Sequence, residues 1–157
     1  MMNKYRIGQA KEFSKDEIAM LKKIVIEAGE VVENTFDRLI SQNPILIFYP
    51  NMSNIEAVGA LKIPYNSYKE NVFRKSKTDY SNGKFEYELG WIVSMKPGNG
   101  KIMTKILSDY KPFIYATVRV ENEKMNHILQ SNGFNKTGEA YNSDRGSYKL
   151  NLYVKEN

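Results

Sequence analysis

Residues 91–101 read Trp-Ile-Val-Ser-Met-Lys-Pro-Gly-Asn-Gly-Lys, and this stretch decides the fold class. The residues leading into it, 85–95, alternate between two kinds of side chain, which predicts a strand with chemically distinct faces. A glycine-bearing loop at 96–100 and a helix at 101–110 follow. Small loop residues let backbone N–H groups and the positive end of a helix converge on an anion. The stretch therefore suits phosphate, although an isolated Gly-x-Gly is also typical of an ordinary turn.

The other elements follow from hydrophobic periodicity and from helix and turn signals, read outward from this stretch. Downstream, we expect a strand at 113–120, a helix at 122–132, and two closing strands at 136–141 and 148–154. Upstream, we expect a strand near 5–7, a helix at 15–28 capped by Ser14, a helical segment at 31–40, a hairpin of strands at 45–49 and 56–63, and a short helix followed by a loop within 66–84. This order predicts an α+β fold in one domain, residues 1–157.

The amino-acid composition excludes several kinds of functional site. The chain has 157 residues, which suits a single domain, and 41% of them are hydrophobic. It contains no cysteine, which excludes disulfides, zinc-thiolate sites and a cysteine acyl-enzyme. The formal net charge of +5 favours an anionic partner. His127 is the only histidine, so we expect no metal site.

A second signature lies downstream, in the segment 120–134. Asn122, Met125, Ile128, Gly133 and Phe134 stand at regular places in it. Together with the strand, Gly-x-Gly loop, helix and strand before it, this pattern resembles the GCN5-related N-acetyltransferases, the GNAT superfamily. The resemblance covers about 86–154 and implies a central mixed, mostly antiparallel twisted sheet of six to seven strands, flanked by about four helices.

The resemblance also implies acetyl-coenzyme A as the cosubstrate and direct acetyl transfer to an amine acceptor, either a small molecule or a protein. The backbone of the glycine loop would hold the pyrophosphate, with Lys101 adding charge. The arm of the cofactor would lie against the preceding strand, with Asn122 on its other side. The implied cofactor-binding residues are Trp91, Ile92, Val93, Gly98, Asn99, Gly100, Lys101 and Asn122.

The catalytic residues are less directly indicated. Leu129 stands where such proteins often have a tyrosine that protonates the departing thiolate. Tyr141 and Tyr148 flank the final loop and are candidate substitutes, with structural packing as the alternative role. Direct transfer needs an uncharged amine, so a base must remove a proton from it. Glu86 and Glu88 lie on the same strand face, and Glu88 is the preferred candidate. The alternative for Glu88 is a solvated or ion-paired carboxylate of the sheet.

Two other functions remain open at this point. A nucleic-acid-associated protein is suggested by aromatic and basic residues gathered at Arg74, Lys75, Lys77, Tyr80 and Lys84. A catalytically silent relative that only binds coenzyme A is compatible with Leu129. No signal peptide or membrane-spanning segment is indicated, so we expect a cytoplasmic protein that is a monomer or a homodimer.

Overall fold

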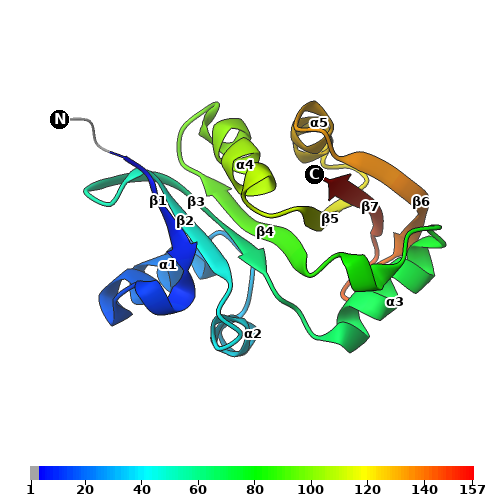
Figure 1. Cartoon of the computed structure of the whole chain (residues 1–157), viewed down its shortest axis with the longest axis horizontal. Coiled ribbons are helices and arrows are strands. Elements are labelled where there is room, and N and C mark those ends of the chain that lie inside the picture. The colour runs from blue at the N-terminus through cyan, green and yellow to red at the C-terminus, as the bar shows by residue number, and fades with distance from the viewer. Residues whose placement is uncertain (1–3) are drawn as a thin grey trace.

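The computed structural model describes residues 4–157, so the first three residues of the predicted domain lie outside it. The strands form one seven-stranded sheet, and five α-helices surround it within the described range (Figure 1). The strands are β1 (Arg6–Gln9), β2 (Ile45–Asn51), β3 (Asn54–Lys62), β4 (Tyr87–Ser94), β5 (Phe113–Arg119), β6 (Asn135–Asn142) and β7 (Lys149–Glu156). The helices are α1 (Lys15–Glu27), α2 (Glu33–Ile40), α3 (Asn66–Ser76), α4 (Asn99–Tyr110) and α5 (Glu123–Ser131).

The sheet has the order β1-β2-β3-β4-β5-β7-β6. All neighbours are antiparallel except β4 and β5, which run parallel. This parallel seam is short, because only Tyr87 with Ile114 and Glu88 with Tyr115 are in register. The predicted mixed, mostly antiparallel sheet is confirmed. Five helices are present where about four were expected, because the polar stretch 66–84 contains the full helix α3.

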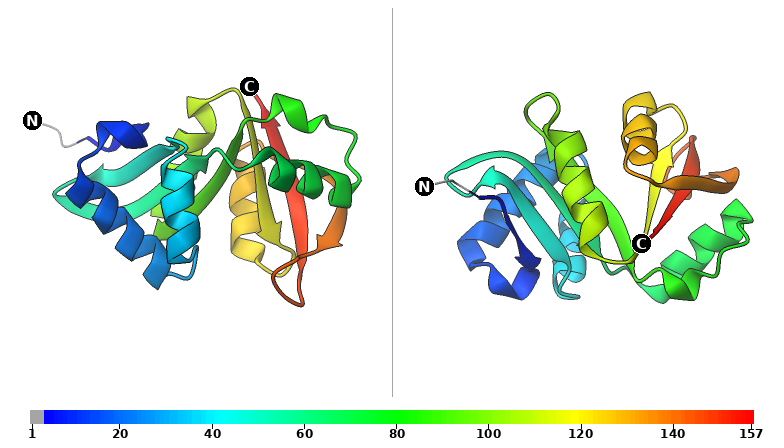
Figure 2. Two further views of the ribbon diagram at one scale, coloured as in Figure 1. Left: turned by 90° about the horizontal axis from the view of Figure 1, so that it is seen from below. Right: turned by 45° about the horizontal axis from the view of Figure 1, so that its top comes forward.

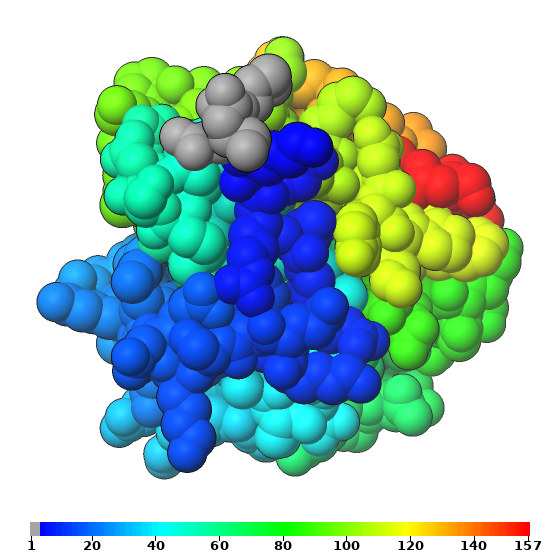
Figure 3. Space-filling view, turned by 60° about the vertical axis from the view of Figure 1, so that its left-hand side comes forward, coloured from blue at the N-terminus to red at the C-terminus, as the bar shows by residue number. Residues whose placement is uncertain are grey.

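Helices cover both faces of the sheet (Figure 2). Helices α1 and α2 pack on one face of β2, β3 and β4 through a cluster that includes Leu21, Phe36 and Trp91. Helices α4 and α5 lie on the opposite face, over a cluster that includes Met103 and Leu129. Helix α3 packs against β5 and β7 through a third cluster. Residues of the N-terminal part, in blue, form much of one side of the molecule (Figure 3).

Helix α1 begins where its sequence predicts. Ser14 is its N-cap, and the Ser14 hydroxyl accepts a hydrogen bond from the N–H of Glu17 at 3.1 Å. The Glu17 carboxylate in turn accepts a bond from the N–H of Ser14 at 2.8 Å, which completes a capping box. Two amides that a helix leaves without partners are thereby satisfied, and this local pairing fixes the start of the helix.

Helix α4 begins at Asn99, two residues before the predicted start. Gly98 is its N-cap and has φ +86°, a left-handed conformation that glycine adopts without steric cost. The tight turn therefore uses Gly98, while Gly100 already belongs to the first helical turn and is buried. The N–H groups of this first turn have no acceptors within the helix.

Strand β4 contains a β-bulge that the sequence did not predict. Trp91 and Ile92 together oppose Gly59 of β3, and Trp91 has φ +54°. The expected alternation is therefore wrong at this point: Leu89 belongs to the α4 face, whereas Trp91 packs on the α2 face. The stacked Phe36 and Trp91 rings, 4.9 Å apart, hold this unusual backbone conformation in place. A β-bulge bends the strand that carries it, so β4 changes direction beyond the two residue pairs that join it to β5.

Gly138 allows α3 and β6 to meet closely. Its φ is +69°, and a Cβ atom at this position would lie 2.2 Å from the carbonyl oxygen of Ser76 at the end of α3. Only glycine fits such a contact with backbone.

Within residues 4–157, no helix has both the length and the apolar character needed to cross a membrane.

Candidate functional site

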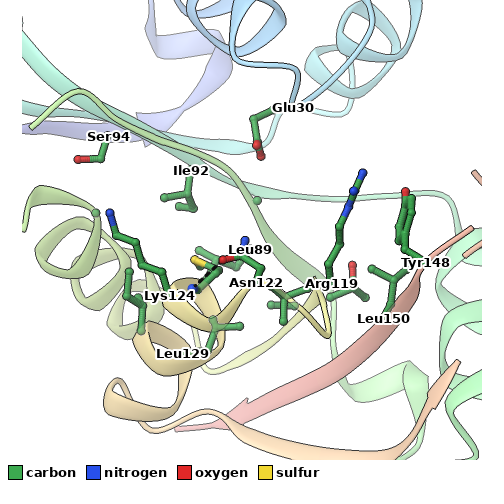
Figure 4. A pocket seen from close by; sticks show the side chains of 17 residues that line it. Glu30, Leu89, Ile92, Ser94, Arg119, Asn122, Lys124, Leu129, Tyr148 and Leu150 are labelled. Atoms are coloured by element: carbon green, nitrogen blue, oxygen red, sulfur yellow. Dashed lines mark hydrogen bonds between the residues drawn. The ribbon is translucent and has the colours of Figure 1, made fainter. Parts of the chain in front are cut away.

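A cavity of about 400 Å³ opens between β4 and β5, beyond the two residue pairs that join these strands (Figure 4). Its walls come from β4, β5, α4, α5, β7 and the connection between α1 and α2. They are formed by Glu30, Leu89, Gly90, Ile92, Ser94, Gly100, Ala116, Thr117, Val118, Arg119, Asn122, Lys124, Met125, Ile128, Leu129, Tyr148 and Leu150. Because β4 pairs only with β3 after Glu88, its other backbone edge faces this cavity.

One end of the cavity is bounded by Gly100 in the first turn of α4. The loop before this helix is fixed by Glu56 of β3, whose carboxylate accepts hydrogen bonds from Lys96 Nζ at 2.9 Å and Asn99 Nδ2 at 2.8 Å. The N–H of Met95 also donates to the Glu56 carbonyl at 2.8 Å. The hydrogen bond from Lys96, followed by that from Asn99, lowers the pKa of Glu56. The helix N-terminus is thus held in place before any anion arrives.

The opposite wall is the start of α5. Asn122 caps this helix, and its Oδ1 atom accepts a hydrogen bond from the N–H of Met125 at 3.1 Å. This bond turns the Asn122 amide group toward the helix and leaves its Nδ2 donor on the cavity side. Lys124 extends from α5 toward β4 in Figure 4. Leu129, at the position where such proteins often have a tyrosine, borders the same cavity but is fully buried in the cluster that includes Met103.

The structure brings part of the predicted cofactor set together. Ile92, Gly100 and Asn122 line the same cavity. Gly98, Asn99 and Lys101 lie at the N-terminal end of α4 beside Gly100, but they do not line the cavity. Side chains of two predicted residues face elsewhere, because Trp91 and Val93 pack on the α1 and α2 side of the sheet. For those two, only main-chain groups are at the β4 edge.

Glu88 lies in a buried polar cluster next to the seam. Its side chain is 4% exposed, pairs with Lys62 Nζ at 3.2 Å and accepts a hydrogen bond from the Tyr68 hydroxyl at 3.0 Å. The charge of Glu88, together with burial, raises the pKa of Tyr68. Burial, followed by the same charge, raises the pKa of Tyr141. The Tyr115 and Tyr141 hydroxyls are both buried and accept or donate no hydrogen bond among the described residues.

Glu88 and Tyr141 do not line the main cavity. Glu88 lines a smaller adjoining cavity together with Glu30, Lys62 and Arg145. Tyr141 lines another, beside Tyr68 and Tyr148. The catalytic roles foreseen for Glu88 and Tyr141 therefore stay predictions.

One opening of the cavity is built by residues that sequence reasoning largely missed. Glu30 enters from the α1–α2 connection, while Arg119 at the end of β5 and Tyr148 before β7 extend toward it (Figure 4). The Arg119 guanidinium lies 3.7 Å from the Tyr148 ring centroid. Of these residues, only Tyr148 had been considered. Glu30 follows a helix-ending glycine and Arg119 ends a strand, and neither position carries a motif.

Glu30 has an unusual environment for a surface carboxylate. Its side chain retains exposed area, yet the protein atoms around the opening displace much of its hydration and raise its pKa, with Lys62 acting in the opposite direction. Glu30 also borders three adjoining cavities. A carboxylate in this position is suited to take a proton from a group entering the opening.

Solved structures share this arrangement of strands and helices. FeeM, an N-acyl amino acid synthase from uncultured soil microbes, superposes with a TM-score of 0.68 at 7% identity, over 99% of this chain and 93% of that chain. A GNAT-family acetyltransferase from Streptococcus agalactiae gives 0.65 at 15% identity, over 98% and 95%. The chain has the GNAT fold. NAA60 from Arabidopsis thaliana, solved in complex with acetyl-CoA, gives 0.64 at 12% identity, over 97% and 98%.

At these identities the likeness establishes the GNAT fold and not the reaction. No protein-family model matches the chain, and no curated protein sequence matches it. Within residues 4–157, no group of three or more histidine, aspartate or glutamate side chains is arranged to hold a metal ion. The activity must therefore be argued from the cavity itself.

Proposed function

We propose that this protein is an acetyl-coenzyme A dependent N-acetyltransferase that transfers the acetyl group directly to an amine. The observation that carries the proposal is the cavity between β4 and β5, which joins a free strand edge, a glycine-bearing helix start and an amide side chain. GNAT-fold neighbours solved with acetyl-CoA add support. We place the reaction in the cytoplasm and expect an amine-bearing small molecule or protein as acceptor.

The residues that would hold the cofactor divide by its chemistry. Its pyrophosphate is an anion, and the N–H groups of Gly100 and Lys101 in the first turn of α4, which have no acceptor within the helix, suit it, with Asn99 beside them. Its extended arm carries amide groups, which the unpaired edge of β4 at Trp91–Val93 would match in the manner of an added strand. Asn122 would contact the arm from the start of α5.

Proton transfer is assigned to residues at the opening. Glu30 would remove the proton from the acceptor ammonium, because it is the carboxylate that lines the main cavity and its pKa is raised. Tyr148 also lines the cavity and is our candidate for protonating the thiolate. Glu88 is the alternative base, although its bonds to Lys62 and Tyr68 also suit a role in holding these side chains.

The basic segment that suggested nucleic-acid binding is largely neutralised. Lys75 pairs with Asp144 at 2.6 Å, and Lys84 pairs with Glu156 at 2.9 Å. Lys77 lies 3.9 Å from Glu139. A phosphate-binding surface needs cations that are free to meet the phosphates. We therefore do not favour the nucleic-acid function.

Binding of acetyl-coenzyme A, measured by isothermal titration, tests the cofactor site. The informative variant is Gly100→Asp, since a Cβ at Gly100 meets only Ser94 atoms, at 3.5 Å or more, and the new carboxylate would repel the pyrophosphate. We expect wild type to bind in the micromolar range and the variant to bind about tenfold or more weakly, a change of about 1.4 kcal/mol. Gly83→Asp, in open surroundings away from the cavity, is the matched control.

Three outcomes separate the alternatives. No binding of acetyl-coenzyme A to wild type contradicts the proposal. Equal binding by wild type and Gly100→Asp moves the cofactor away from the start of α4. Normal binding with no turnover across a broad amine panel favours the catalytically silent coenzyme A binder.

A further inference from the structure

The entrance for the acceptor has an unusual charge balance. We define the charged mouth as Glu30, Arg38, Arg119 and Arg145, which line the main cavity or the two adjoining ones. Arg145 stands in the loop between β6 and β7, and Arg38 stands in α2. The four charges come from four different parts of the chain and meet around one opening.

Most other charged groups near this opening are already paired. Lys62 binds Glu88 at 3.2 Å, Lys22 binds Glu33 at 2.9 Å, and Lys75 binds Asp144 at 2.6 Å. The charged mouth is different. Among residues 4–157, no ion pair engages any of its four members.

Three guanidinium groups and one carboxylate therefore line these cavities, and Glu30 borders all three of them. Arg119 lies against the ring of Tyr148 at 3.7 Å, and Arg38 lies over Tyr65 at 4.9 Å. Both aromatic contacts use the face of the guanidinium plane and leave its N–H edge available. Arg145 lines the same small cavity as Tyr68 and Glu88, so it borders the polar cluster beside the seam.

We propose that the acceptor amine carries a carboxylate of its own, as in a free amino acid. Arg145 and Arg119 would bind the carboxylate, because a guanidinium presents paired N–H donors that match its two oxygens. Glu30 would meet the ammonium. The acceptor's ammonium would pair with Glu30 and its carboxylate with the arginines. The charged mouth would thereby gain ion-pair partners of both signs. This inference rests on the proposed acetyl transfer and specifies its substrate class.

The reaction then balances without any further reagent. Glu30 removes one proton from the ammonium, and the freed nitrogen lone pair forms a bond to the thioester carbonyl carbon. The C–S bond breaks, and its electron pair leaves with the sulfur. The nitrogen gives up its second proton as the amide forms, and the thiolate takes up one proton to give coenzyme A. The product is an N-acetyl amino acid that keeps its carboxylate on the arginines, and the first proton leaves Glu30 for solvent.

Release of free coenzyme A thiol from acetyl-coenzyme A tests this class. The acceptors are the twenty standard amino acids, each compared with its own carboxamide, together with spermidine and phenethylamine as amines without a carboxylate. We expect at least one amino acid to react with kcat/KM at least about tenfold above its carboxamide. A preference for carboxamides, for spermidine or for phenethylamine overturns the inference, as does the absence of turnover with every amino acid.

Variants connect the preference to the arginines. Arg145→Gln should lower kcat/KM for the preferred amino acid by about tenfold to a hundredfold, mainly through KM, and leave its carboxamide nearly unchanged. Arg74→Gln, an exposed arginine of α3 outside the charged mouth, is the matched control. Equal losses for both acceptors in Arg145→Gln contradict carboxylate binding. Acetyl-coenzyme A titration of the same samples keeps a failure of this inference distinct from a failure of the proposed function.

Discussion

At the scale of single residues, Glu30 combines two opposed demands. It stands where a base is needed, and the surroundings that raise its pKa also make its charge unfavourable in the folded state. A carboxyl group whose pKa is higher in the folded than in the unfolded chain stabilises the fold at low pH, and that contribution is lost as pH rises through the folded pKa. Activity and stability should therefore respond to this residue in opposite directions.

Glu30→Gln tests both responses. At about pH 8 the variant should melt at a higher temperature than wild type, and the difference should vanish at about pH 3, where the carboxyl group is protonated in both states. Acetyl transfer should fall by about 10² to 10⁴ because the base is gone. Melting curves and initial rates over this pH range provide the measurement. Glu88→Gln, compared under the same conditions, shows which carboxylate shapes the acid limb of the rate profile.

Gly138 provides a residue-scale prediction about stability. Replacing it with alanine forces a left-handed conformation, at about 1–2 kcal/mol, and drives a Cβ into the Ser76 carbonyl. Gly138→Ala should therefore lower the free energy of unfolding by about 2 kcal/mol or more, measured by urea denaturation. Gly83→Ala, where no neighbour approaches closer than 3.9 Å, should change little. A loss in Gly138→Ala as small as that in Gly83→Ala would mean that α3 moves away from β6 without cost.

At the scale of elements, the sequence predicted what depends on local signals. The capping residues of α1 and the hairpin of β2 and β3 appear where they were expected, because neighbouring residues specify them. The bulge at Trp91 depends instead on Gly59 of another strand and on Phe36 of α2. The alternation of residues within β4 carries no information about partners on other elements, so the predicted alternation failed at this position.

The same reasoning explains the candidate site. Ile92, Gly100 and Asn122 belong to two ordered signatures, and all three line the cavity. Glu30 and Arg119 come from segments about ninety residues apart, and only the folded sheet brings them to one opening. A position that acquires its meaning from tertiary packing has no signature in a single sequence.

The loop before α4 gives an element-scale prediction. Glu56→Gln removes the charge that holds Lys96 and weakens the contact with Asn99, so the first turn of α4 should be less well positioned. We expect the dissociation constant of acetyl-coenzyme A to rise about tenfold, in line with the loss of a hydrogen bond to a charged group that positions the helix start. Glu70→Gln, an exposed carboxylate of α3, is the control for titration. Unchanged affinity in Glu56→Gln would show that the loop holds its form without this contact.

At the scale of the whole molecule, the two parts of the sheet share only the short seam between β4 and β5. A cofactor arm lying against β4 would add backbone hydrogen bonds at the place where this ladder ends. Acetyl-coenzyme A should therefore slow hydrogen exchange at residues 90–94 while leaving β1 unchanged, as measured by mass spectrometry. At about 100 times its dissociation constant it should add about 2.7 kcal/mol to stability. Protection confined to the start of α4 would contradict the strand-like placement of the arm.

The walls of the acceptor entrance come mainly from the α1–α2 connection and the loop between β6 and β7, whereas the proposed cofactor contacts come from β4, α4 and α5. Two exposed connections can change their residues and lengths without disturbing a ladder or a buried cluster. The choice of acceptor is thus free to diverge while the acyl donor stays the same. Exchanging residues 143–147 for a loop of different charge offers a direct route to retargeting this scaffold toward another amine.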